Sequence, residues 1–169
     1  LDTAFANCHI ISYASMTNKR VCNSTLQAEG HAMIAAVDSG DRLRAMICGM
    51  QGQLKMKEWE SSINRTLKHM WLSDCESLVS HLKNPKDEKL SNSRLSIDIV
   101  GLKQHLWNKE DGTQYEDLPK ATEADTTLRW IDTSTMACDP LTKRMKPDVL
   151  WKVFDGCLDL TPTPESLLI

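Results

Sequence analysis

The sequence lacks the features that mark membrane, secreted and zinc-binding proteins. No apolar run approaches the roughly 20 residues that a helix needs to span a bilayer, so no membrane association is expected. The chain does not open with a basic segment followed by an apolar one, which favours an intracellular location, cytoplasmic or nuclear. The 6 cysteines form no C-x-x-C pair, so a zinc site is disfavoured and reduced thiols are expected.

The sequence also lacks an excess of basic residues. Its 20 lysines and arginines are outnumbered by 23 aspartates and glutamates, which gives a net charge of −3. Affinity for nucleic acid comes mostly from lysine and arginine against phosphates, so this balance is against a strong stand-alone nucleic-acid binder. With 169 residues, 41% of them hydrophobic, the chain suits one globular domain. Its first residue is Leu1 rather than Met, which suggests a fragment or a processed piece.

Hydrophobic patterns predict strands that alternate with helices. The clearest amphipathic helix spans residues 91–107, where leucine and isoleucine recur on one face. A helix that starts at Ser24 or Thr25 is expected to break at Ser39-Gly40. This order favours a mixed α/β sheet with helices packed on it. Strands are predicted at 10–13, 67–73 and 128–132, and further helices at 43–50, 58–64, 76–82 and 147–156.

One acidic residue lies on the apolar face of a predicted helix. Leu26, Met33 and Val37 share that face, because offsets of seven and four bring side chains back to the same side. Glu29 lies on the same face. An ionised carboxylate there is costly unless a cation, a metal or a hydrogen-bond donor compensates it. Spacing alone also allows a carboxylate at the edge of the stripe that reaches solvent.

Two further acidic residues stand at the ends of predicted elements. Asp74 directly follows the strand 67–73, and ligands of open α/β sheets gather beyond the carboxyl ends of strands. Asp139 precedes Pro140 at the start of a predicted helix. Both positions are equally compatible with helix caps, so neither establishes a site by itself.

Four segments of the chain resemble the motifs of one family. Residues 24–29 match S-T-x-x-A-E, and residues 137–143 are similar to A-D-x-L-T-K. Residues 71–77 look like a strand followed by an aspartate, and residues 2–7 resemble D-A-x-[WF]-A. Together they resemble the ribonuclease H domain at the end of copia-type retrotransposon Pol polyproteins. The resemblance covers nearly the whole chain and keeps the family's order of acids.

The resemblance implies both a fold and an activity. The fold would be a ribonuclease H-like mixed sheet flanked by helices over residues 1–146, with residues 147–169 as a C-terminal helix and tail of the same domain. The activity would be that of a nuclease, a hydrolase that cuts the RNA strand of RNA–DNA hybrids beside the reverse transcriptase portion of the polyprotein. Selectivity would rest on minor-groove shape and 2′-hydroxyls.

By the same resemblance, Asp2, Glu29, Asp74 and Asp139 would be the catalytic residues and the ligands of two metal ions. Crowded carboxylates raise one another's pKa unless cations compensate them. Mg²⁺ prefers oxygen ligands, and Mn²⁺ is the expected substitute. Two such ions about 4 Å apart activate water and stabilise the leaving oxygen in phosphodiester hydrolysis.

The chain departs from the family at its N-terminus. The family's domain opens with three antiparallel strands, but only 26 residues separate Asp2 from Glu29, so part of this meander is expected to be missing. Asp2 also lies where terminal strands fray unless they are paired. Activity is therefore expected only if the site is intact, and a catalytically inactive remnant, acting as a folded or interaction module, is the alternative. An integrase-like protein is disfavoured, because its carboxylates follow a different order.

Structural roles are expected for the other conspicuous side chains. Lys143 follows Asp139 and is expected on a solvated helix face, with a phosphate contact as the alternative. Asp98 falls on the polar side of its helix and is left out of the site. Histidines 69, 81 and 105 are widely spaced and are expected to be solvated or capping. The core is expected to include Trp71, Trp107 and Trp130.

Overall fold

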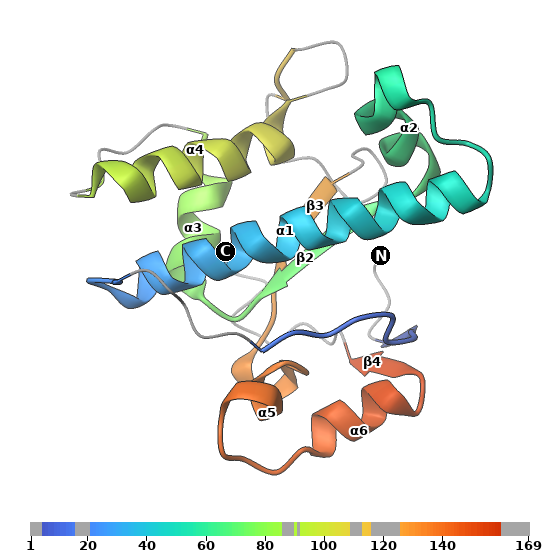
Figure 1. The fold of residues 1–169 in the computed structure, drawn as a ribbon. Coiled ribbons are helices and arrows are strands. Elements are labelled where there is room, and N and C mark those ends of the chain that lie inside the picture. The colour runs from blue at the N-terminus through green and yellow to red at the C-terminus, as the bar shows by residue number, and fades with distance from the viewer. Residues whose placement is uncertain are drawn as a thin grey trace.

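One long helix, α1 (Thr25–Met50), crosses the middle of the molecule, with α4 above it and α5, α6 and β4 below it in Figure 1. The computed structural model describes residues 5–15, 21–85, 90, 92–108, 113–115 and 126–159. Helices and strands are both present, so the broad α/β class is confirmed. The other helices are α2 (Trp59–Thr66), α3 (Glu76–Lys83), α4 (Ser93–Trp107), α5 (Asp139–Thr142) and α6 (Asp148–Phe154), and the strands are β1 (Phe5–Asn7), β2 (His69–Ser73), β3 (Thr126–Trp130) and β4 (Cys157–Asp159).

The strands of the described residues form two separate pairs rather than one mixed sheet. Strands β2 and β3 are parallel, with His69 opposite Thr126 and Ser73 opposite Trp130. Strands β1 and β4 are antiparallel, which ties the C-terminal part of the chain to its N-terminal part. Because β2 and β3 run the same way, the residues that follow both strands meet at one edge of the pair.

The core lies between the parallel pair and the helices α1, α3 and α4. Leu78 and Leu82 on α3 are fully buried, and Leu106 on α4 is 1% exposed. The indole Nε1 of Trp107 donates a hydrogen bond of 2.9 Å to the Leu82 carbonyl, which links α4 to α3. The predicted apolar face of α4 is confirmed, and so are the tryptophans of the core: Trp71 and Trp107 are buried and Trp130 packs against the cluster.

Helix α1 begins where the sequence predicts and continues past its expected end. Ser24 is the N-cap, and its Oγ accepts a hydrogen bond of 3.2 Å from the Gln27 N–H. The break expected at Ser39-Gly40 is wrong, because α1 continues to Met50. A glycine inside a helix costs only about 1 kcal/mol relative to alanine. Packing explains the glycine, since a Cβ at Gly40 would lie 2.6 Å from Nε2 of His69.

Replacing Gly40 with alanine should therefore lower the free energy of unfolding by about 1–3 kcal/mol, the usual cost of overpacking. The ring of His69 cannot retreat easily, because Nδ1 lies 3.3 Å from Asp41 Oδ1 and the ring packs edge-on against Trp71. Gly101→Ala in α4 is the matched control, since a Cβ there meets no heavy atom within 4 Å. It should raise stability by about 0.5–1 kcal/mol through helix propensity. Urea unfolding measures the change in the free energy of unfolding for both variants. If both variants are destabilised, or both stabilised, the packing explanation is contradicted.

Several boundaries differ from the sequence-based expectation. The strand predicted at 10–13 is wrong: residues 8–15 have no regular structure, and Ile11 and Tyr13 are 68% and 73% exposed. A strand needs a neighbouring edge to pair with, and none of the described strands pairs with this segment. The third predicted strand, at 128–132, instead spans Thr126–Trp130, the residues in register with β2.

Among the helices of the described residues, none has the length and apolar composition of a membrane span.

Candidate functional site

Three predicted carboxylates come from separate elements and meet at one edge of the parallel pair. Asp74 directly follows β2, Asp139 begins α5 after β3, and Glu29 lies near the start of α1. Burial raises the pKa of Glu29, and the charges of Asp74 and Asp139 raise it further. Glu29 is therefore close enough to Asp74 and to Asp139 to be repelled by both. Asp2, the fourth predicted ligand, lies outside the described residues.

The backbone around Asp74 is fixed by neighbours on both strands. The Trp130 Nε1 donates a hydrogen bond of 3.2 Å to the Asp74 carbonyl, and the Ile131 N–H donates one of 3.0 Å to the Ser73 carbonyl. The Ser73 Oγ in turn accepts a hydrogen bond of 3.1 Å from the Cys75 N–H. These bonds extend the parallel pairing just past the ends of the strands and hold Asp74 at the edge.

Asp139 is the first residue of α5, one position inside the helix cap. The following Pro140 suits this first turn, because its fixed φ is helical and its missing N–H would have no partner there. The Asp139 side chain is only 9% exposed. A carboxylate this buried needs a compensating partner. The cap position itself belongs to Cys138, whose side chain makes no capping hydrogen bond.

Lys143 supplies a cation to the Asp139 carboxylate. Its Nζ lies 2.8 Å from Oδ1 and 2.9 Å from Oδ2 of Asp139. The hydrogen bond that Lys143 donates to Asp139 raises the pKa of Lys143, and the charges of Asp139, Asp74 and Glu29 raise it further. The exposed position expected for Lys143 is confirmed, since its side chain is 56% exposed, and the pairing with Asp139 is an additional contact that was not predicted. The i,i+4 spacing of the two residues is the sequence signal that could have identified the pair.

The same charges affect the neighbouring thiol. Burial raises the pKa of Cys138, and the charges of Asp139 and Asp74 raise it further. A raised thiol pKa keeps the sulfur protonated at neutral pH, and the thiolate is the nucleophilic form. The arrangement therefore favours chemistry at the carboxylates and not at Cys138.

The raised pKa of Glu29 predicts a pH-dependent effect of Glu29→Gln. Because the folded-state pKa lies above 4.5, the ordinary pKa of a glutamate, ionisation of this carboxyl weakens the fold as the pH rises through that range. The variant should therefore have a higher melting temperature than the parent at pH 7, and the gain should vanish below about pH 4. Thermal unfolding with a chelator present measures this. Glu76→Gln, at an exposed first-turn position of α3, should give no gain, and equal gains would contradict the prediction.

The donor set suits a divalent cation in its chemistry. Carboxylate oxygens are the ligands that Mg²⁺ prefers, and the cluster already attracts one ammonium group. Its positions are not those of a ready-made site: in the part of the chain that the structure describes, no three or more His, Cys, Asp or Glu side chains are arranged to hold an ion. Binding at Glu29, Asp74 and Asp139 would require these side chains to move together.

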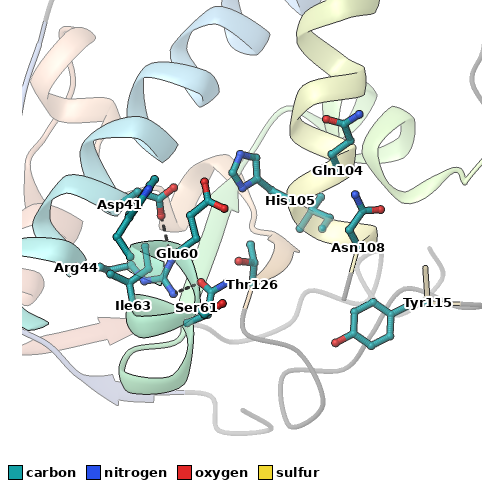
Figure 2. Close-up of a pocket in the computed structure, with 13 residues that line it drawn as sticks. Asp41, Arg44, Glu60, Ser61, Ile63, Gln104, His105, Asn108, Tyr115 and Thr126 are labelled. Carbon is teal, nitrogen blue, oxygen red and sulfur yellow. Dashed lines mark hydrogen bonds and ion pairs between the residues drawn. The ribbon is translucent and has the colours of Figure 1, made fainter. Parts of the chain in front are cut away.

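A separate cavity of about 330 Å³ lies toward the opposite edge of the parallel pair. Figure 2 shows Asp41 and Arg44 from α1 facing Gln104 and His105 from α4, with Thr126 at the start of β3 between them. Asp74 follows the last residue of β2, whereas Thr126 is the first residue of the parallel strand β3 and so lies at the other end of the pair. The cavity and the carboxylate cluster are therefore distinct.

Arg44 turns its hydrogen-bond donors inward at this cavity. Nε donates to the Leu67 carbonyl at 3.0 Å, Nη2 to Asn64 Oδ1 at 2.8 Å and Nη1 to Asp41 Oδ1 at 3.0 Å. Burial alone would raise the pKa of Asp41, but hydrogen bonds from His69 and Arg44 outweigh it and lower that pKa. The His69 side chain is 16% exposed and its Nδ1 lies 3.3 Å from Asp41 Oδ1, so it is neither solvated nor capping, which corrects the expectation. This network joins α1 to α2 and to the approach to β2, so its role is structural.

The candidate site therefore consists of Glu29, Asp74 and Asp139, with Lys143 bound to the last of them. Asp98 stays outside it, paired with His31 at 3.1 Å between α4 and α1. The grounds for the site are the motifs and the mutual repulsion of the three carboxylates. Comparison of the chain with protein-family models, with curated proteins and with solved structures gives no match.

Proposed function

We propose that this chain is a ribonuclease H-like domain of a copia-type retrotransposon polyprotein that hydrolyses the RNA strand of RNA–DNA hybrids. One observation carries the proposal. Glu29, Asp74 and Asp139 were selected by motif from distant parts of the chain, and their charges act on one another in the folded protein.

The arrangement of elements supports the finer fold assignment. A parallel pair followed at its carboxyl ends by acidic residues, with α1, α3 and α4 packed around it, is compatible with a mixed sheet flanked by helices. The proposed domain spans residues 1–146, with residues 147–169 completing it.

The proposed chemistry assigns each carboxylate the role of a metal ligand. Glu29, Asp74 and Asp139 would hold two Mg²⁺ or Mn²⁺ ions, and Asp2 would complete the set. Ions bound there would activate water and stabilise the leaving oxygen of a phosphodiester. The chain's own contribution is position, since hydrogen bonds hold the Asp74 backbone and α5 holds the buried Asp139. With a net charge of −3, the chain would depend on the reverse transcriptase portion of the polyprotein for much of its affinity for the hybrid.

The test is to incubate the purified protein with a labelled RNA–DNA hybrid and Mg²⁺ or Mn²⁺. The expected result is cleavage of the RNA strand alone, with no cleavage of duplex DNA or of duplex RNA, and none after addition of a chelator. Absence of cleavage, together with no metal-induced rise in melting temperature, would reject the proposal.

The second candidate is a catalytically inactive remnant that acts only as a folded or interaction module. The observation that favours it is the contact of Lys143 with both oxygens of Asp139, because a permanent ammonium could replace metal altogether. In that case the protein would show neither cleavage nor metal-dependent stabilisation. The two candidates share a fold, so only these measurements separate them.

A further inference from the structure

We infer that the ammonium group of Lys143 is an exchangeable internal cation, which holds the carboxylate cluster together without metal and must leave Asp139 before a divalent ion binds there. The inference deepens the proposed function and rests on it for the identity of the incoming ion. It assigns Lys143 a positioning role that sets the metal concentration at which the site fills.

The contact geometry places Lys143 where an ion would bind. Its Nζ lies within 2.9 Å of both carboxylate oxygens of Asp139. Since the same oxygens would be the ligands of Mg²⁺, lysine and metal ion compete for them directly. A divalent ion within a few ångströms of an ammonium would also be repelled by it.

The difference in exposure between the two partners makes exchange possible. The Asp139 side chain is 9% exposed, whereas the Lys143 side chain is 56% exposed. The Lys143 N–H donates a hydrogen bond of 2.7 Å to the Asp139 carbonyl, so the backbone at the end of α5 is held independently of the side chain. The ammonium can therefore turn into solvent without unfolding the helix, while the carboxylate stays in place.

The charge of Lys143 also acts on the other two carboxylates of the site. It favours the ionised form of Glu29, against the opposing effect of Asp74 and Asp139. It also interacts with Asp74. One positive charge among three carboxylates relieves only part of their repulsion, which leaves room for a more highly charged cation to replace it.

The experiment measures metal binding without any nucleic acid. Titration calorimetry and thermal unfolding with Mg²⁺ or Mn²⁺ would compare the parent with Lys143→Met, Lys143→Gln and Lys143→Arg. The Met and Gln variants should melt at a lower temperature than the parent in chelator, gain more from metal, and show a dissociation constant about fivefold lower. The Arg variant keeps the charge and should stay close to the parent. Lys146→Met, at a nearby exposed position, is the matched control and should leave affinity unchanged.

Each outcome decides the inference separately from the proposed function. Equal or weaker metal binding by the Met and Gln variants would overturn it, even if the parent cleaves hybrids. Metal binding by these variants but not by the parent would support it, and would show that the parent is held inactive by its own lysine. If no variant binds metal, the inference is overturned, and the cleavage assay alone then decides the proposed function.

Discussion

Replacing Arg44 with methionine should lower the free energy of unfolding by about 3–5 kcal/mol, because it removes one partner of a buried ion pair. The Arg44 side chain is 9% exposed and that of Asp41 is 16% exposed. Methionine fills similar space but leaves the Asp41 charge without its guanidinium, and the Leu67 carbonyl and the Asn64 amide without their donor. For a chain of this length, the loss corresponds to a fall in melting temperature of about 6–12 °C or more.

Arg42→Met provides the matched control, because Arg42 is exposed on the same helix. It should change stability by about 0.5 kcal/mol at most. Arg44→Lys should recover only part of the loss, since an ammonium cannot reproduce the guanidinium fork. Adding Asp41→Asn to Arg44→Met should also recover stability by removing the uncompensated charge. If Arg42→Met and Arg44→Met lose similar amounts of unfolding free energy in urea, the Arg44 network does not contribute to stability.

The Arg44 network also has a pH signature. The pKa of Asp41 is lowered in the folded protein, so its contribution to stability is present above 3.8, the ordinary pKa of an aspartate, and is lost as the pH falls through the lowered pKa. In the Arg44→Met variant that acid-dependent loss should be smaller, because part of the stabilisation of the ionised carboxyl is already gone. Melting temperatures measured between pH 2 and pH 5 would show the difference.

The elements that the sequence predicted well are those with strong local signals. Apolar residues recur at helical spacing along α4, and all of the residues on its predicted apolar face are buried. The cap at Ser24 depends only on its own helix and was predicted correctly. Helices α2 and α3 lie within two residues of the ranges expected for them.

The predictions that failed depend on contacts between distant residues. The glycine at position 40, inside α1, is explained by the close approach of His69, which comes from a strand almost thirty residues later in the chain. The apolar residues at 10–13 have β propensity but no strand edge to pair with, whereas residues 5–7 pair with 157–159 across nearly the whole chain. Short strands carry little periodicity, so no local pattern could reveal that pairing.

In the candidate site, too, some features could be predicted from the sequence and others depend on contacts in the folded protein. The proximity of Glu29 to Asp74 and Asp139 was expected from the family motifs, and for Asp74 also from the rule that ligands gather beyond the carboxyl ends of strands. The position of Lys143 was not expected, because its side chain has to fold back along α5 to reach Asp139. Spacing allows that contact but does not require it, and the charge of the surrounding carboxylates favours it.

Under the proposed function, neutralising either Glu29 or Asp74 should reduce hybrid cleavage by at least about 100-fold, the size of effect that follows loss of one positioned catalytic group. Glu29→Gln and Asp74→Asn keep the shape of the side chain and remove the charge that would bind the ions. Asp132→Asn is the control, because Asp132 lies near the end of β3 and its Oδ1 accepts a hydrogen bond of 2.8 Å from the Ser134 N–H, which asparagine can also accept.

Stability separates a chemical effect from an effect on folding in this experiment. Glu29→Gln is expected to raise the melting temperature at pH 7, so a slower but more stable enzyme would place the loss in the chemistry. Cleavage rates are best measured across a range of Mn²⁺ concentrations, because a weakened ligand set can be partly filled at high metal. If both variants cleave as fast as Asp132→Asn, these carboxylates do not bind the catalytic metal ions. Their repulsion would then only destabilise the folded protein.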